Sequence, residues 1–187
     1  SAVYQDNLEV KAERPANRQL AFKASKQIRN LDWPQGHATS KTRTSNAVLA
    51  ADLKLRWSTS IGIGDTARAR LTADPISKGG IIFTMDSQMV LTATSKSGSR
   101  LWSKDLTPPT EGSGQADGGG LAIGGGMLFA STGYGDLWAL EPKTGQKIWK
   151  QALLGTGNSQ PAYSDGLVYL VSNDATSWAI ESKTGRI

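Results

Sequence analysis

The 187-residue sequence contains no cysteine and only one histidine, His37. Without cysteine there are no disulfides, thiolate nucleophiles or Cys-ligated zinc sites, and one histidine excludes a multi-histidine metal site. A Ser-His-Asp triad would depend on His37 alone, and its polar surroundings predict a surface position. The acidic residues are scattered singly, mostly at turn positions such as Asp165 and Asp174. We therefore expect no enzymatic activity, no cofactor and no bound metal.

Long apolar runs are also missing. No run approaches the roughly 18–20 residues that a membrane-spanning helix needs. The apolar residues occur instead in runs of about four to seven, rich in Ile, Val, Leu, Phe, Tyr and Trp and bounded by Gly, Pro, Asn or Asp. Such runs predict β-strands and are too short for an amphipathic helix. With 21 glycines for tight turns, the sequence predicts an all-β protein.

One hairpin pattern occurs three times. The copies are "VLTATSKSGSRLW" at 90–102, "LWALEPKTGQKIW" at 137–149 and "SWAIESKTGRI" at 177–187. Their turn glycines, Gly98, Gly145 and Gly185, are 47 and 40 residues apart. Glycine supplies the positive φ that a three-to-five-residue hairpin loop requires. The pattern predicts a repeated strand-turn-strand unit.

Each hairpin follows two further apolar segments. The nearer ones are "GGIIFTMD" from Gly79, "GGMLFAST" from Gly125 and "GLVYLVSN" from Gly166, and the farther ones begin at Pro75, Leu121 and Pro161. Four short strands in about 40–47 residues are typical of a β-propeller blade. The sequence predicts a partial β-propeller of about three four-stranded antiparallel blades. They cover residues 57–106, 107–153 and 154–187, the last incomplete, after a basic N-terminal arm and lead-in at 1–56.

The tryptophans follow the same period. Trp57, Trp102 and Trp149 are 45 and 47 residues apart, each expected on the strand after a turn or loop, and Trp138 and Trp178 are 40 apart. A large flat side chain at a fixed place in each blade fills the gap against the next blade. These positions therefore predict inter-blade packing. The alternative is an aromatic box for a sugar or a quinone.

The net charge of +5 is concentrated at the N-terminus. Residues 1–56 contain ten Lys and Arg against five Asp and Glu, whereas residues 57–187 contain eleven of each. A basic arm can contact nucleic acid or anionic lipid. Here the basic residues are spread singly, without aromatic residues between them. We interpret the arm as a solvated segment and predict no nucleic-acid partner.

The hairpin resembles a known repeat. "ALEPKTGQKIW" at 139–149, with its Ala, acid, Thr-Gly, base and Trp, is similar to the repeat of quinoprotein dehydrogenases. "AIESKTGRI" at 179–187 also matches, up to the missing tryptophan. The copy at 90–102 keeps only Gly98 and Trp102, with Ala93 one place out of register. A dehydrogenase would need a calcium site, a catalytic aspartate and, in many members, a vicinal cysteine pair beneath the quinone.

A second resemblance is more specific. Residues 56–86 are similar to the opening blade of the outer-membrane β-barrel assembly lipoprotein B (BamB) family, and "NLDWPQGHATSKTRTSN" at 30–46 resembles the lead-in of its alphaproteobacterial members. The family implies an eight-bladed, non-enzymatic periplasmic scaffold, tethered by lipid to the inner leaflet of the outer membrane. It binds the periplasmic domains of the barrel insertase. The family's lipidated cysteine is not in this sequence, and its partner-contacting loops lie mainly after the third repeat, so no contact residue is carried over.

Three blades leave apolar faces and strand edges open. We therefore expect a fragment of a protein roughly twice as long, and self-association of this chain. The favoured function is a non-catalytic scaffold of the outer-membrane assembly machinery. Alternatives are a quinone-dependent dehydrogenase relative and a generic ligand-binding propeller whose basic arm contacts an anionic surface. The long loop "TPPTEGSGQADGGG" at 107–120 is a candidate partner-binding segment.

Overall fold

The computed structural model describes residues 23–36, 46–67, 69–153 and 155–187. His37 and most of the basic arm lie outside these residues, so the hypotheses about them stay predictions. The described residues form eleven β-strands and no helix. No helix capable of crossing a membrane is therefore found in this part of the chain.

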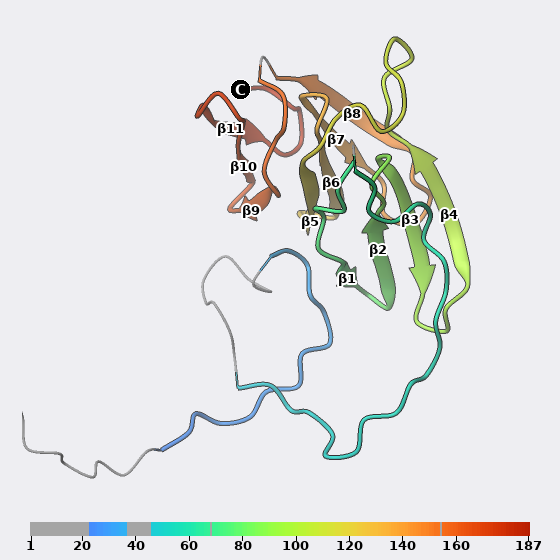
Figure 1. The fold of residues 1–187 in the computed structure, drawn as a ribbon. Helices are drawn as coiled ribbons and strands as arrows, with labels where there is room; N and C mark the ends of the chain where they lie inside the picture. Colours follow the sequence, from blue (N-terminus) through green and yellow to red (C-terminus); the bar gives the residue numbers. More distant parts are fainter. Residues whose placement is uncertain (1–22, 37–45, 68, 154) are drawn as a thin grey trace, which may run out of the picture.

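The strands form three antiparallel sheets in chain order (Figure 1). The first contains β1 (Ile76–Lys78), β2 (Ile81–Met85), β3 (Val90–Ser95) and β4 (Arg100–Asp105). The second contains β5 (Gly119–Gly124), β6 (Met127–Thr132), β7 (Asp136–Leu140) and β8 (Lys147–Ala152). The third contains β9 (Ala162–Ser164), β10 (Leu167–Val171) and β11 (Ser177–Glu181).

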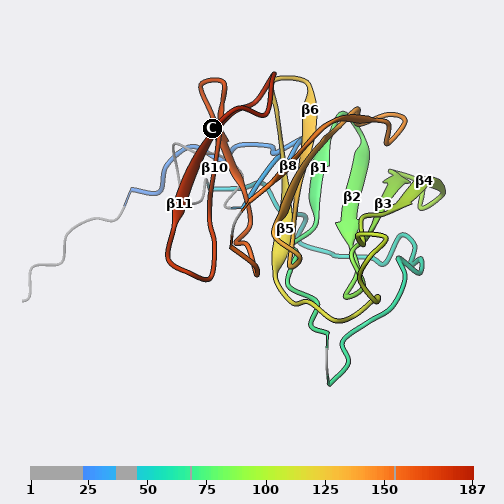
Figure 2. The same cartoon turned by 90° about the horizontal axis from the view of Figure 1, so that it is seen from above.

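The sheets stand next to one another as blades (Figure 2). Their first strands lie together, because β5 contacts both β1 and β9. These three are the inner strands, and β4 and β8 are the outer strands of the two four-stranded sheets. This arrangement confirms an all-β partial β-propeller. The sheets fall inside 57–106, 107–153 and 154–187, and those exact blade boundaries stay a prediction.

The first two strands of every sheet are joined by a two-residue turn. Both turn residues have positive φ: 58° and 80° at Gly79–Gly80, 57° and 82° at Gly125–Gly126, and 49° and 85° at Asp165–Gly166. Two successive positive φ values are typical of a type I′ turn, whose twist matches that of the flanking strands. Aspartate tolerates this conformation better than most residues with a side chain. The inner hairpins therefore have one geometry throughout.

The outer hairpins share a β-bulge. Trp102 pairs with Ala93 and Trp149 pairs with Ala139, and in each case the residue just before the tryptophan is left out of the pairing. Ala93 is therefore structurally equivalent to Ala139. The sequence comparison placed it one position out of register because the first hairpin loop is one residue shorter. A bulge bends its strand and re-aims the neighbouring side chain, here the indole.

The core consists of two layers, one on each side of the second sheet. Because side chains alternate along a strand, Leu128 and Ala130 pack toward the first sheet, whereas Phe129 packs toward the third. All three are fully buried. The ring of Phe129 stacks on that of Tyr163 in the third sheet, with 6.0 Å between the ring centroids. The middle sheet is thus apolar on both faces, as a propeller blade between two others must be.

Two local expectations were wrong. The segment 107–120 is not a loop throughout, because Gly119 and Gly120 begin β5. A Cβ on Gly119 would overlap the carbonyl of Ser131 on the adjacent strand, so glycine lets the strand start two residues early. Trp57 is not on a strand either. Within the described residues, no sheet edge pairs with the segment that carries it.

Candidate functional site

Three indoles dock on the hairpin turn of the following repeat. The Trp102 Nε1–H donates to the carbonyl of Pro142 at 3.0 Å, and its ring lies against Gly145. Trp149 makes the same contact one repeat later, and Trp57 makes it one repeat earlier. The partners of Trp149 are the Ser182 carbonyl at 2.9 Å and Gly185, and those of Trp57 are the Lys96 carbonyl at 2.9 Å and Gly98.

The turn glycines are required for two separate reasons. Their φ values are 90° at Gly98, 70° at Gly145 and 75° at Gly185, a region that side chains disfavour. An added Cβ would also lie 2.9, 2.7 and 2.9 Å, respectively, from an indole atom of the docked tryptophan. The indole therefore occupies the space that any other residue's side chain would need.

Trp138 and Trp178 do not dock on a hairpin turn. Each lies on the face of its own sheet that is turned toward the preceding sheet. Trp138 packs into the core layer between the first and second sheets. Lys150 lies 5.0 Å from the centroid of its ring and forms an ion pair with Asp136 at 2.8 Å. Trp178 packs into the next core layer and donates from Nε1 to Ser172 Oγ at 3.0 Å. The five indoles are thus spread over separate contacts and do not surround one cavity.

A short stretch of the lead-in, bridged to β1 at Trp33 and bent at Gln35, contacts all three inner strands. We call residues 32–36 the inner segment. Trp33 and Ser77 of β1 exchange two backbone hydrogen bonds, each 2.8 Å. The Ile123 N–H of β5 donates to the Pro34 carbonyl at 2.7 Å. The inner segment therefore forms an antiparallel bridge with the edge of the first sheet and accepts one hydrogen bond from the edge of the second.

The third sheet holds the same stretch through a side chain. The backbone N–H of Tyr163, on β9, donates to Gln35 Oε1 at 2.8 Å. Gln35 is only 5% exposed, and Gly36 lies against the side chain of Gln160. A buried amide needs hydrogen-bond partners. Gln35 therefore ties the third sheet to the inner segment by a specific polar contact.

The inner segment is anchored by a carboxylate at its first residue. Lys78 Nζ donates to Asp32 Oδ2 at 2.9 Å, and the Gly79 N–H donates to Oδ1 at 2.8 Å. The hydrogen bond from Lys78, followed by that from Gly79, lowers the pKa of Asp32 below its ordinary value. The ammonium group and the N–H of the β1–β2 turn thus form a small carboxylate-binding site.

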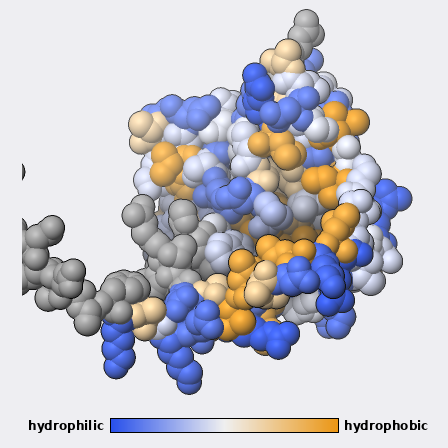
Figure 3. Space-filling model, turned by 60° about the horizontal axis from the view of Figure 1, so that its bottom comes forward, coloured by the Kyte–Doolittle hydropathy of each residue, from blue (hydrophilic) through white to orange (hydrophobic). Residues whose placement is uncertain are grey.

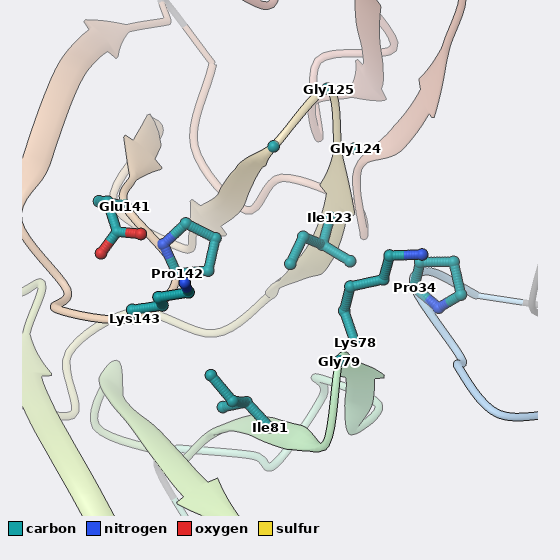
Figure 4. Close-up of a pocket in the computed structure, with 11 residues that line it drawn as sticks. Pro34, Lys78, Gly79, Ile81, Ile123, Gly124, Gly125, Glu141, Pro142 and Lys143 are labelled. Atoms are coloured by element: carbon teal, nitrogen blue, oxygen red, sulfur yellow. The ribbon is translucent and has the colours of Figure 1, made fainter.

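A groove of about 410 Å³ lies beside the inner segment, between the first and second sheets (Figure 4). Pro34, Ile81, Ile123 and Pro142 form apolar walls, and Lys78 and Lys143 stand on opposite sides. Most of the lining surface is apolar, as in sites that bind peptides or small molecules. The groove thus combines an apolar floor with two cationic groups.

Glu141, which also lines the groove, is engaged by its own turn. The Thr144 N–H donates to Glu141 Oε2 at 2.6 Å. Burial raises the pKa of Glu141, but hydrogen bonds from Thr144 and the Lys143 N–H outweigh this effect and lower it overall. Its carboxylate is therefore ionised at neutral pH and satisfied within the β7–β8 turn. Lys78 is engaged by Asp32, so Lys143 remains the charged group available to a ligand.

The described residues contain no cluster of three or more Asp, Glu or His side chains that could hold a metal. We derive no step through a calcium-quinone centre. The inner edges and groove can instead bind an extended peptide through backbone hydrogen bonds and carboxylate contacts. Sequence reasoning missed this site, although one signal was present: Pro34 restricts Trp33 to an extended backbone.

Comparison with known proteins identifies relatives of this chain. The family model of the outer membrane protein assembly factor BamB matches residues 86–187. The BamB protein of Yersinia pestis is 25% identical over 136 residues, which cover 70% of this chain and 34% of that protein. The chain thus spans about a third of the length of this curated relative.

Two solved dehydrogenase structures show the same fold. The quinohemoprotein alcohol dehydrogenase from Comamonas testosteroni has a TM-score of 0.62 and 23% identity over 85% of this chain and 27% of its own. A europium-containing methanol dehydrogenase has a TM-score of 0.60 and 18% identity, over 83% of this chain and 31% of its own. BamB from Moraxella catarrhalis has a TM-score of 0.49 and 18% identity, over 65% of this chain and 37% of its own. At these identities the likeness to the dehydrogenases concerns the fold alone.

Proposed function

The chain belongs to the family of the outer membrane protein assembly factor BamB, and on this premise we propose that it is a non-catalytic, protein-binding propeller of the outer-membrane assembly machinery. It acts in the periplasm at the inner leaflet of the outer membrane, held there by a lipid anchor outside this chain. Its partner is the set of periplasmic domains of the barrel insertase. The blades provide a rigid support that presents strand edges and loops to the partner.

The observation that carries this proposal is the binding of the inner segment by all three sheets. Two inner strands form hydrogen bonds with its backbone, and the third donates one to the side chain of Gln35. Addition of an extended segment to exposed strand edges is a common mode of protein recognition. Main-chain hydrogen bonds give affinity in this mode, and neighbouring side-chain contacts give specificity. The blades thus have a surface suited to extended protein segments.

Co-purification tests the proposed partner. The 187-residue chain, immobilised through a tag, is expected to retain the purified periplasmic domains of the barrel insertase. A periplasmic protein of similar size and charge serves as the control ligand and is expected to wash through. Retention of neither protein, together with quinone- and calcium-dependent oxidation of an alcohol, would favour the dehydrogenase alternative instead.

Self-association belongs to the same proposal. Within the described residues β11 pairs only with β10, and its other edge carries no strand. Tyr169 and Val171 of the adjacent β10 are 41% and 46% exposed. Hydrophobic residues also gather in a band on the face shown in Figure 3. Such edges and patches favour association, so sedimentation velocity is expected to show oligomers; a stable monomer at all concentrations would contradict this.

A further inference from the structure

The turn between β1 and β2 shows how this fold holds a carboxylate. Asp32 receives one hydrogen bond from the Gly79 N–H and another from the ammonium group of Lys78. Hydrogen bonds in which one or both groups are charged are shorter and stronger than neutral ones. Gly79 has a φ of 58°, which fixes the direction of its N–H. One turn N–H and one lysine are therefore sufficient for this contact.

The turn between β5 and β6 offers a backbone donor like the Gly79 N–H. Gly125 and Gly126 have φ values of 57° and 82°, against 58° and 80° at Gly79 and Gly80. The Gly125 N–H stands in the same relation to its turn as that of Gly79. No acceptor for it is found among the described residues. Gly125 lines the groove, so this donor belongs to the same surface.

Lys143 offers an ammonium group, the counterpart of that of Lys78. It reaches the groove from the β7–β8 turn, across from Lys78 (Figure 4). Within the part of the chain that the structure describes, Lys143 lies in no ion pair, whereas Lys78 is bound to Asp32. Among the described residues that line the groove, Glu141 is the one with a carboxylate, and it accepts hydrogen bonds inside its own turn. The groove thus holds two lysines and one carboxylate, and Lys143 is the lysine whose ammonium group forms no ion pair within the described residues, although its charge helps to lower the pKa of Glu141.

The apolar walls define the rest of the ligand. Ile81 and Ile123 face the space between the two lysines (Figure 4). Pro34 of the inner segment forms part of the same wall, so the groove continues a surface that already binds an extended stretch of protein. A ligand that fills it needs an apolar side chain next to an acidic one.

We propose that the groove binds an extended segment of a partner protein through an acidic residue and its apolar neighbour. Lys143 and the Gly125 N–H receive the carboxylate, and Ile81 and Ile123 receive the apolar side chain. This rests on the proposed protein-binding function and names the kind of segment that is bound. Because charge-assisted contacts at a surface are screened by salt, binding weakens as ionic strength rises.

Fluorescence anisotropy tests this with a peptide that copies the inner segment and the two residues before it. The probe is fluorescein-labelled Asn-Leu-Asp-Trp-Pro-Gln-Gly, the sequence of residues 30–36, and its counterpart has Asn in place of Asp. The 187-residue chain is expected to bind the acidic probe about tenfold or more tightly than the Asn probe. Lys143→Gln is expected to remove this preference. Lys183→Gln, at the same position in the third turn, is the matched control and leaves binding unchanged.

Several outcomes overturn the proposal. They are the absence of saturable binding of the acidic probe, equal binding of the two probes, and unchanged binding to Lys143→Gln. Loss of binding to Lys78→Gln but not to Lys143→Gln would show that the probe has replaced the inner segment, which also contradicts the groove. If Lys143→Gln still retains the insertase domains as well as the parent chain, only the groove proposal fails. If neither the parent chain nor Lys143→Gln retains the insertase domains, the proposed function fails.

Discussion

The indole of Trp102 on β4 lies against Gly145 in the turn of the second sheet and donates its N–H to the carbonyl of Pro142 at 3.0 Å. The same relationship joins Trp149 to Gly185 and Trp57 to Gly98. Neighbouring repeats are therefore connected by more than their apolar core layers. Each contact combines apolar burial, one directional hydrogen bond and a backbone conformation that glycine alone adopts without strain.

Removing the indole is expected to destabilise the fold. Trp102→Ala removes ring contacts with Phe83 and the hydrogen bond to Pro142. Because the indole is half-buried, we expect a loss of about 3 kcal/mol, at the lower end of the range for large aromatic side chains. Urea unfolding followed by circular dichroism measures this. Leu101→Ala, at a neighbouring side chain that is 50% exposed, is the control and is expected to cost less than about 1 kcal/mol.

A glycine comparison separates steric overlap from backbone strain. Gly145→Ala introduces a Cβ at a φ of 70° and 2.7 Å from the Trp102 indole. Gly126→Ala introduces one at a φ of 82° with no heavy atom within 4 Å. Both variants carry the strain, about 1 kcal/mol or somewhat more. Gly145→Ala is expected to lose about 1–3 kcal/mol beyond that through overpacking; equal losses in urea unfolding would show that the docked indole is not constrained.

The attachment of the inner segment at Asp32 is expected to weaken in acid. The folded-state pKa of Asp32 is lowered below 3.8, so its contribution is fully present above the unfolded pKa and is lost as pH falls through the folded value. Amide hydrogen exchange at Trp33 and Ser77 measures the attachment, after correction for the intrinsic effect of pH. Protection is expected to fall below about pH 3.8 in the parent chain. In Asp32→Asn it is expected to be reduced already at neutral pH, and a pH profile that matches the parent would refute the role of Asp32.

Gln35 is expected to connect the third sheet to the inner segment. Gln35→Ala leaves the Tyr163 N–H without its acceptor, Gln35 Oε1, and an unsatisfied buried donor costs about 1–3 kcal/mol. Amide exchange at Tyr163 should accelerate, while exchange at Ile123, which donates to Pro34, changes less. Leu31→Ala, at a side chain that is 79% exposed, is the control. Unchanged exchange at Tyr163 in Gln35→Ala would contradict this connection.

The strands and turns could be predicted because their causes are local. Short apolar runs bounded by glycine pairs specify hairpins, and the repeated Thr-Gly and tryptophan positions specify their periodicity. The fold class follows from repetition of one unit. Ala93 was placed out of register because the alignment counted residues around the turn, whereas strand pairing fixes Ala93 opposite Trp102.

The candidate site could not be predicted because its contacts are not local. Asp32 and Lys78 are 46 residues apart, and Gln35 and Tyr163 are 128 apart. No periodicity in the sequence records that three strand edges meet at one extended segment. Glycine frequency alone likewise does not tell which turn N–H lacks an acceptor. These features depend on how the sheets stand relative to one another.

The central claim, that this propeller recognises protein, is tested most directly by isothermal titration calorimetry of the 187-residue chain with the purified periplasmic domains of the barrel insertase. The account predicts saturable binding with a defined stoichiometry, weakened by increasing salt. The absence of any binding heat at several temperatures, with both proteins folded by circular dichroism, would contradict it.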